Sequence, residues 1–311
     1  MSRRLRFVPP QSLVEVTCRT VHGRFLLSPL PEIVDATLGI LARAARLSAM
    51  PIHAFVFLSN HYHLLVTPTD AHHLAAFMGY LNSNLAREIG RLVHWREAFW
   101  SSRYHAILVS EEEGAQIDRL RYLLSHGCKE NLVLHPQEWP GASGLDSLLS
   151  GAPMHGTWRD RTLEGKAARR GVVLARDAFV STESLSLVPL PAWAHLNPEE
   201  QRARIEDLVS TIDSSNQARL AETQTAPLGV ERLLRQPAHQ EANRRRRTPA
   251  PLVHAISPDV RRRFREQYRR FFAAFRLAAQ KWKSGAADAL TSFPQGCFPP
   301  FAPFVPVPSG G

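Results

Sequence analysis

Cysteine is scarce in this chain, and the few cysteines lie far apart. The 311 residues include 3 cysteines, Cys18, Cys128 and Cys297, and no C-x-x-C pair occurs among them. This spacing excludes a zinc site built from clustered cysteines and provides no disulfide framework. A reducing cytoplasm is therefore the expected location.

Long apolar segments are also missing. No run approaches the ~18 apolar residues that a membrane-spanning helix needs, so we expect no membrane partner. The first residues, MSRRLRFVPPQ, contain arginines but no apolar stretch behind them. They therefore lack the pattern of a secretory signal.

Acidic residues are outnumbered by basic ones. The sequence has 38 Lys and Arg against 28 Asp and Glu, which gives a formal net charge of +10 and a pI of about 10.2. This balance favours a polyanionic partner such as nucleic acid, although a basic protein can also simply be basic. Hydrophobic residues make up 44 % of the chain, enough for a core in one large or two modest domains.

Hydrophobic periodicity predicts alternating strands and helices in the first 130 residues or so. Strands are expected at 13–27, 53–67 and 99–109, and helices at 31–48, 70–93 and 111–127. Pro31 suits the first turn of a helix, and Asp70 suits an N-cap. A further strand hidden near either end would complete an α+β sandwich, with helices on one face of an antiparallel sheet.

The composition of the sequence changes after about residue 134. Residues 135–160 are rich in Pro, Gly and Ser, which predicts an irregular surface excursion. We expect a short basic helix at 163–176, a linker at 189–193, and longer helices from residues 198 and 258. The predicted divisions are a domain at 8–145, a basic, mostly helical extension at 146–290, and a disordered Pro/Gly-rich tail at 291–311.

The stretch HAFVFLSNHYHLLVTP, residues 53–68, carries the first chemical signal. If it is one buried strand, His61 and His63 lie on the same face and Tyr62 lies on the other. Two imidazoles side by side on a strand suit half of a divalent metal site. The alternative is a chance pair, with one histidine in the core and the other in solvent.

A tyrosine and a histidine one helical turn apart give the second signal. Tyr122 and His126 lie four residues apart on the helix predicted at 111–127, so they point the same way. If they face His61 and His63, three imidazoles can hold one metal beside a phenol. A tyrosine phenolate can attack a phosphodiester that a metal polarises. The alternative is a half-buried helix tyrosine and a histidine at the helix end.

Four motifs resemble, in the same order, those of the single-tyrosine HUH transposases, and are closest to the REP-associated tyrosine transposase branch. LSNHYHLLVTP resembles P-N-H-x-H-L-L-V, and WSSRY, residues 100–104, resembles W-Q-x-R-Y. YLLSHGCKENLV, residues 122–133, resembles Y-I-H-x-N-P-V-R-A-G-L-V, and PQEWPGAS, residues 136–143, resembles P-x-x-W-P-W-S-S. Four ordered matches over residues 10–145 or so are more specific than any single one.

The resemblance implies a ferredoxin-like sheet with the two histidines on a central strand. It makes His61 and His63 metal ligands, Tyr122 the nucleophile, and His126 the side chain that completes a Mg or Mn site. The implied reaction cleaves and rejoins single-stranded or hairpin DNA through a 5′-phosphotyrosine. Departures from the family pattern leave activity open: Ser59 replaces Pro, Ser101 replaces Gln, and His126-Gly127 replaces Asn-Pro.

Basic and aromatic side chains near these motifs and on the helix after residue 258 are the candidate DNA contacts. They are Arg103, Tyr104, Arg119, Arg121, Lys129, Arg262, Arg265 and Arg269. The run Arg244–Arg247 is a candidate flexible arm. The alternative for the helix after residue 258 is a surface helix with a solvated basic face. The alternative for Tyr104 is a place in the core.

Two rival functions remain open from the sequence. One is a catalytically inactive, domesticated protein that binds DNA hairpins, and the other is a metal-binding protein outside nucleic-acid biology. The net basicity argues against the second rival. The long C-terminal extension, on a domain that we expect to be self-sufficient, favours a monomer over a homodimer.

Overall fold

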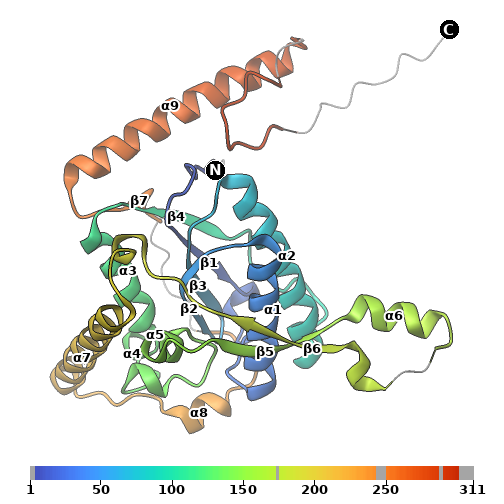
Figure 1. Cartoon of the computed structure of the whole chain (residues 1–311), viewed down its shortest axis with the longest axis vertical. Helices are drawn as coiled ribbons and strands as arrows, with labels where there is room; N and C mark the ends of the chain where they lie inside the picture. The colour runs from blue at the N-terminus through green and yellow to red at the C-terminus, as the bar shows by residue number, and fades with distance from the viewer. Residues whose placement is uncertain (1–3, 173–174, 243–249, 287–289, 301–311) are drawn as a thin grey trace.

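A five-stranded sheet forms the centre of the protein, and its strand order is β2-β3-β1-β4-β7 (Figure 1). The computed structural model describes residues 4–172, 175–242, 250–286 and 290–300. The strands are β1 (Val14–Arg19), β2 (Ile52–Leu58), β3 (His61–Val66), β4 (His105–Val109) and β7 (Val253–His254). The first four pair antiparallel in the ferredoxin-like order, and β7 adds a short parallel edge to β4. The predicted α+β class is confirmed.

The strand predicted at 53–67 is wrong in one respect, because it is a hairpin rather than a single strand. β2 and β3 pair with Leu58 opposite His61, so Ser59 and Asn60 form the connection. The apolar residues on both sides hide this turn, although Ser and Asn are typical turn residues. The missing fourth strand therefore lies inside this stretch. His61 and His63 both belong to β3, so they keep the predicted common face.

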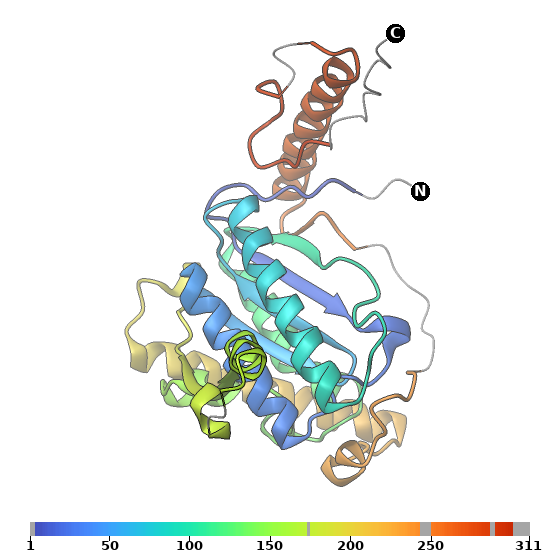
Figure 2. The same cartoon turned by 90° about the vertical axis from the view of Figure 1, so that its right-hand side faces the viewer.

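Two helices cover one face of the sheet (Figure 2). α1 (Pro31–Ser48) has the predicted bounds, and α2 (Ala71–Leu92) begins behind Asp70, whose Oδ1 accepts the His73 amide at 2.8 Å. The predicted inward side chains of α2 have at most 1 % exposed area; they are Leu74, Phe77, Met78, Leu81 and Leu85. They pack on the β3 side chains Tyr62, Leu64 and Val66.

The opposite face of the sheet is covered by α3 (Glu113–Leu124), α4 (His126–Lys129) and α7 (Pro198–Thr223) (Figure 1). Here Leu65 of β3 and Val56 of β2 join a second core with Leu120 and Leu123 of α3. Val209 of α7 belongs to the same cluster. Helices therefore lie on both faces of the sheet, and the face under α3 is the one that carries His61 and His63.

The segment predicted as an irregular excursion at 135–160 is mostly ordered structure, so that prediction is wrong. It holds α5 (Leu145–Ser150) and β5 (Met154–Arg159), and β5 pairs with β6 (Val180–Leu185). This hairpin packs on α1, where Asp35 Oδ1 accepts the Thr157 amide at 3.1 Å. The strand sequence MHGTWR lacks clear alternation, because packing on the helix rather than its own pattern stabilises it.

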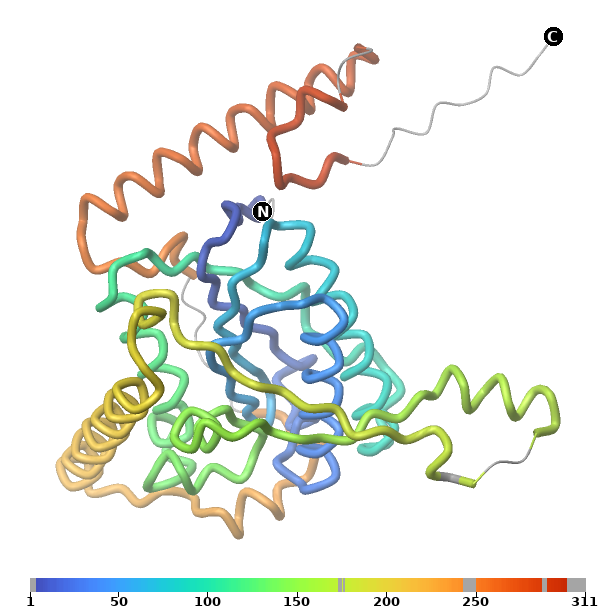
Figure 3. The backbone as a smooth tube through the Cα atoms, in the orientation of Figure 1, coloured from blue at the N-terminus to red at the C-terminus, as the bar shows by residue number. Residues whose placement is uncertain are grey.

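The C-terminal part is mostly helical, as predicted. α6 (Arg161–Arg169) is the short basic helix, α8 (Val230–Leu234) follows α7, and α9 (Pro258–Lys283) extends away from the sheet beside the N-terminal segment (Figure 3). The Phe7 ring lies 5.1 Å from Phe271 and 6.0 Å from Tyr268, between ring centroids. Arg244–Arg247 and residues 301–311 of the predicted tail lie outside the described residues, and the predicted domain boundaries stay predictions.

Within the described parts of the chain, no helix has both the length and the apolar character needed to cross a bilayer.

The contact of α1 with β5 gives a stability prediction. A Cβ at Gly39 would lie 2.1 Å from the Thr157 carbonyl oxygen, so the two backbones must separate in Gly39→Ala. We expect a loss of about 1–3 kcal/mol or more in the free energy of unfolding. Gly79→Ala on α2 is the control, since a Cβ there meets nothing within 4 Å and a gain of about 0.5–1 kcal/mol is expected. Equal urea midpoints for the two variants would contradict this packing.

Candidate metal centre and tyrosine site

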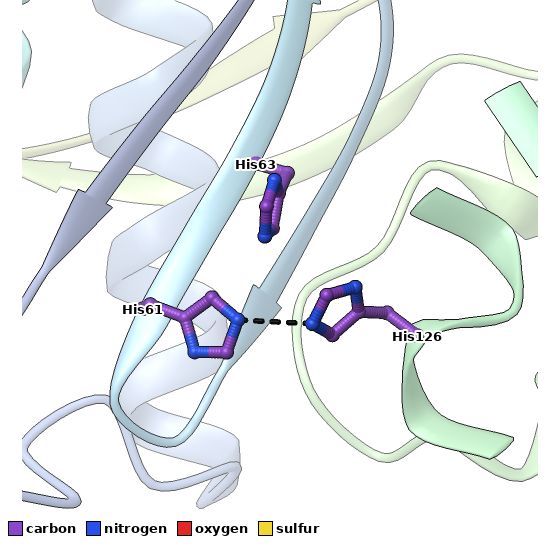
Figure 4. A group of neighbouring side chains, drawn as sticks. All are labelled: His61, His63 and His126. Carbon is purple, nitrogen blue, oxygen red and sulfur yellow. Dashed lines mark hydrogen bonds between the residues drawn. The ribbon is translucent and has the colours of Figure 1, made fainter. Parts of the chain in front are cut away.

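Three histidines from two distant parts of the chain meet between β3 and the helices that cover it (Figure 4). His61 and His63 project from β3, and His126 opens α4 directly behind α3. The Nε2 atoms of His61 and His126 lie 3.0 Å apart, and the candidate ligand atoms of all three lie within 4.8 Å of one another. The predicted histidine set is therefore brought together in space.

Neighbouring acceptors orient two of these rings. His61 Nδ1 lies 2.6 Å from Asn60 Oδ1, and His63 Nδ1 lies 2.9 Å from Glu15 Oε1. An acceptor at Nδ1 places the proton on that nitrogen, so that Nε2 keeps its lone pair for a ligand. Asn60 in the hairpin turn and Glu15 on β1 thus orient both histidines so that the Nε2 atom of each is available as a ligand.

The donor set fits one divalent ion. Two nitrogen ligands at about 2.1 Å from an octahedral ion lie about 3 Å apart, which is the spacing of His61 and His126. Burial lowers the pKa of His61 well below its usual value, and the charges of His63 and His126 lower it further. Burial also lowers the pKa of His126 to about 3, with His63 and Lys129 adding to the effect. Both rings are therefore neutral at pH 7, and an all-imidazole set suits transition ions better than Mg.

Tyr122 lies against this histidine set. Its ring centroid is 4.9 Å from that of His126 and 5.5 Å from that of His63. The guanidinium carbon of Arg119 lies 4.8 Å from the Tyr122 ring centroid, and Lys129 Nζ lies 4.4 Å from it. Burial raises the pKa of Tyr122 and Glu15 raises it further, while Arg119 opposes the shift. The phenol therefore keeps its proton at neutral pH.

A cavity of about 370 Å³ opens beside Tyr122. Three predicted DNA contacts, Arg119, Arg121 and Lys129, line it. Arg219 of α7 lines the same cavity and was not predicted, because nothing in the sequence relates α7 to α3. Arg121 also pairs with Asp118 at 2.6 Å.

The other predicted DNA contacts lie elsewhere. Arg103 donates to the Arg4 carbonyl at 2.7 Å, and Tyr104 has only 8 % of its area exposed. The Arg6 guanidinium covers a face of the Tyr104 ring at 4.0 Å, which agrees with the alternative of a place in the core; a DNA contact by Tyr104 stays a prediction. Arg262 pairs with Asp259 on the exposed side of α9. Arg265 and Arg269 line a second cleft.

Three residues around the histidines were missed by sequence reasoning. They are Glu15, Asn60 and His254. A lone acid within the apolar strand LVEVT was the available signal for Glu15, because a buried carboxylate needs partners. Asn60 resembled an ordinary turn residue, and His254 lies in a two-residue strand that no periodicity marks.

The fold and the site together define a ferredoxin-like domain with a three-imidazole centre beside a tyrosine. Residues 31–122 match the family model described as IS200-like transposase, which confirms the resemblance for that part of the chain. The matched segment contains His61, His63 and Tyr122 and ends before His126. No curated protein matches the chain.

The solved structures that resemble the protein include two transposases. One is a REP-associated tyrosine transposase bound to a REP hairpin, with 15 % identity over 48 % of this chain and 86 % of that chain, at a TM-score of 0.41. The other is a candidate transposase from Deinococcus radiodurans R1, with 22 % identity over 39 % of this chain and 93 % of that chain, at a TM-score of 0.28.

The histidine set predicts a single divalent-ion site that needs all three rings. In His126→Ala, we expect the affinity for Mn²⁺ to fall by more than the roughly 10- to 100-fold that loss of an outer-shell partner costs. Titration calorimetry of the metal-free protein measures it. His155→Ala on exposed β5 is the control and should bind like the unchanged protein. Equal affinities for the His126 and His155 variants would show that His126 is not a ligand.

Proposed function

We propose that this protein is a metal-dependent DNA transposase that cleaves and rejoins single-stranded or hairpin DNA, with Tyr122 as nucleophile. One observation carries the proposal: Tyr122 packs against both His63 and His126, next to His61. A nucleophile and a metal site this close can act on the same phosphate. The family match over residues 31–122 supports the same reaction class.

The proposed reaction exchanges one phosphodiester for another. Tyr122 Oη attacks the scissile phosphorus, the P–O3′ bond breaks, and a 5′-phosphotyrosine forms. The phenol proton ends, overall, on the released 3′ oxygen, so a free 3′ hydroxyl is available for rejoining. A divalent ion held by His61, His63 and His126 would polarise the scissile phosphate when bound.

The charges around Tyr122 suit a phosphate substrate. Arg119 and Lys129 both lie over its ring and can pair with phosphate oxygens in the adjacent cavity. Arg119 also favours the phenolate electrostatically and opposes the effect of burial, although the pKa of Tyr122 stays raised. We propose that these two side chains, with Arg121, place the scissile phosphate over the tyrosine.

Three earlier expectations belong to this proposal. The protein acts as a monomer, it works in the cytoplasm, and residues 8–145 contain the catalytic residues. The inactive hairpin-binding protein is the second candidate function. Its support is the His126-Gly127 pair, which replaces the usual Asn-Pro of the family the chain resembles.

Covalent capture tests the proposal. Hairpin oligonucleotides with randomised single-stranded flanks carry a label at the 3′ end, because a 5′-phosphotyrosine keeps the DNA on the 3′ side of the cut. With Mn²⁺ or Mg²⁺, the unchanged protein should acquire the label in a denaturing gel. Tyr122→Phe should lose it completely, since the ring stays but the nucleophilic oxygen is absent.

Tyr80→Phe is the matched control, because Tyr80 lies on α2, on the other face of the sheet, where its hydroxyl accepts a hydrogen bond from Arg43. It should label like the unchanged protein. Labelling of Tyr122→Phe at the same level would disprove the role of Tyr122. Hairpin binding by the unchanged protein without any labelling would favour the inactive candidate.

A further inference from the structure

A basic cleft lies between α3, which belongs mostly to the segment that matches the transposase family, and α9, which lies outside that segment. Its volume is about 720 Å³, and residues 251–256, which include β7, also line it. Six of its lining side chains are basic or imidazole groups: Arg4, Arg119, Arg261, Arg265, Arg269 and His254. The one acid in the lining is Asp118, whose carboxylate already pairs with Arg121 at 2.6 Å.

The arginines of α9 form a stripe along this cleft. Arg261, Arg265 and Arg269 recur every four residues, so they share one face of the helix over about 12 Å. Among the described residues, Arg265 and Arg269 have no ion pair or hydrogen bond. Arg262 and Arg270, on other faces, pair with Asp259 and Glu266. Within the described parts of the chain, Arg265 and Arg269 of the stripe therefore present charges without an ion-pair partner.

The start of α9 is fixed against α3. Glu112 accepts the backbone amides of Ile256 at 3.0 Å and Ser257 at 2.9 Å. Ser257 in turn caps α9, and β7 pairs with β4 just before it. The stripe is therefore held opposite α3 by hydrogen bonds at its base.

The cleft is continuous with the tyrosine site. Arg119 and Asp118 line both the α3–α9 cleft and the cavity beside Tyr122. A polyanion lying along the α9 stripe would thus reach Arg119 and then Tyr122. Phosphates recur about every 3.4 Å along one strand of a duplex, so the stripe matches roughly three of them.

We propose that the α3–α9 cleft binds the sugar-phosphate backbone of the DNA next to the scissile phosphate. This inference rests on the proposed transposase function and gives α9 the second wall of the DNA-binding groove. The phosphates come either from the hairpin stem or from the single-stranded flank. Hairpin probes with and without a flank distinguish these two sources.

Binding is measured in Tyr122→Phe protein, so that it does not depend on cleavage. The test variant replaces Arg261, Arg265 and Arg269 with Gln, and the matched control replaces Arg262, Arg263 and Arg270 with Gln. Both lose three charges from one helix. Fluorescence anisotropy with a labelled hairpin, with and without a single-stranded flank, should show roughly ten-fold or greater weakening for the stripe variant alone.

The salt dependence gives a second readout. The slope of log affinity against log salt should become shallower by about 2 to 3 for the stripe variant, since each lost phosphate contact removes about 0.7 to 0.9. If the stripe variant binds only the flanked probe more weakly, the cleft binds the single-stranded flank. If it binds both probes more weakly, the cleft binds the hairpin stem. Equal weakening in stripe and control variants, or no binding by the parent, overturns the proposal. Loss of binding in the stripe variant without covalent labelling in the unchanged protein would reject only the catalytic function.

A second inference comes from the buried carboxylate behind His63. Glu15 has 2 % exposed area; its Oε1 lies 2.9 Å from His63 Nδ1, and its Oε2 lies 2.9 Å from His254 Nε2. Arg119 lies 3.6 Å from the same Oε2. Burial raises the pKa of Glu15, but the contacts with His254 and His63 outweigh this and leave the pKa far below its usual range.

A carboxylate behind a ligand histidine fixes the ring and its tautomer, and loss of such a partner typically weakens metal binding. His63 and His254 lie close to the two oxygens of Glu15, and these contacts restrict rotation of the carboxylate. We infer that His254, which lies far along the chain on β7, is a positioning residue that acts on the metal site through Glu15 and His63.

The test compares His254→Leu, which removes the contact, with His254→Gln, which keeps an N–H donor. We expect roughly 10- to 100-fold weaker Mn²⁺ binding by calorimetry for Leu and recovery for Gln. In metal-free protein, ¹⁵N NMR of the histidine rings should show the Nδ1–H tautomer of His63 in the unchanged and Gln forms and a mixture in Leu. His155→Leu on exposed β5 controls for loss of a histidine.

His254→Ala replaces the Leu variant if the latter does not fold. Unchanged metal affinity and an unchanged His63 tautomer in a folded variant would overturn this role. The role would also be overturned if His254→Gln bound Mn²⁺ as weakly as His254→Leu, because the N–H donor retained in His254→Gln would then have no effect.

Discussion

The register of β3 between β1 and β2 is the constraint on which the candidate site depends. His61 lies opposite both Arg19 and Leu58, so the hairpin and the central strand fix it from two sides. With this register, Tyr62 and Leu64 enter the core under α1 and α2, while His61 and His63 face α3. A slip by one residue would reverse both sets. The apolar core on one face therefore holds the polar centre on the other.

That constraint explains why part of the site was predictable from sequence. Alternation along a strand and the four-residue spacing of Tyr122 and His126 are local rules, so the members of each pair lie next to one another as expected, although the predicted helix is divided between α3 and α4. Their meeting depends on α3 packing across the sheet, and only the family resemblance indicated it. Glu15, His254 and Arg219 reach the site through contacts far apart in the sequence, which no local pattern encodes.

The same distinction applies to the fold. α1 and α2 were predicted well because their apolar faces repeat with the helical period over many residues. The turn at Ser59–Asn60 was hidden by apolar residues on both sides, and the β5–β6 hairpin is stabilised by α1 rather than by its own pattern. Of the predicted DNA contacts on α9, Arg265 and Arg269 line the cleft and Arg262 does not. The sequence does not indicate which face of α9 is turned toward α3, so these three residues could not be told apart.

A polar cluster of this kind is costly inside a core. His63, His126 and Glu15 are all buried, and each polar atom that lacks a partner there opposes folding. The apolar side chains of the second core offset this cost. Ile205, Val209 and Ile212 of α7 join the α3 side chains in that cluster, so the helix that carries Tyr122 is packed on both sides.

The packing of α7 has a consequence for the proposed chemistry. A tyrosine that attacks a phosphate must be held at a fixed distance from the metal ligands, and small displacements of such groups lower rates steeply. Tyr122 and His126 lie on either side of the junction between α3 and α4, where the Ser125 amide bonds to the Arg121 carbonyl at 2.9 Å. α7 braces this junction through Arg219, which donates to the Cys128 carbonyl at 3.0 Å. The extension beyond residue 145 thus takes part in positioning the tyrosine and the third histidine, as well as in covering the core.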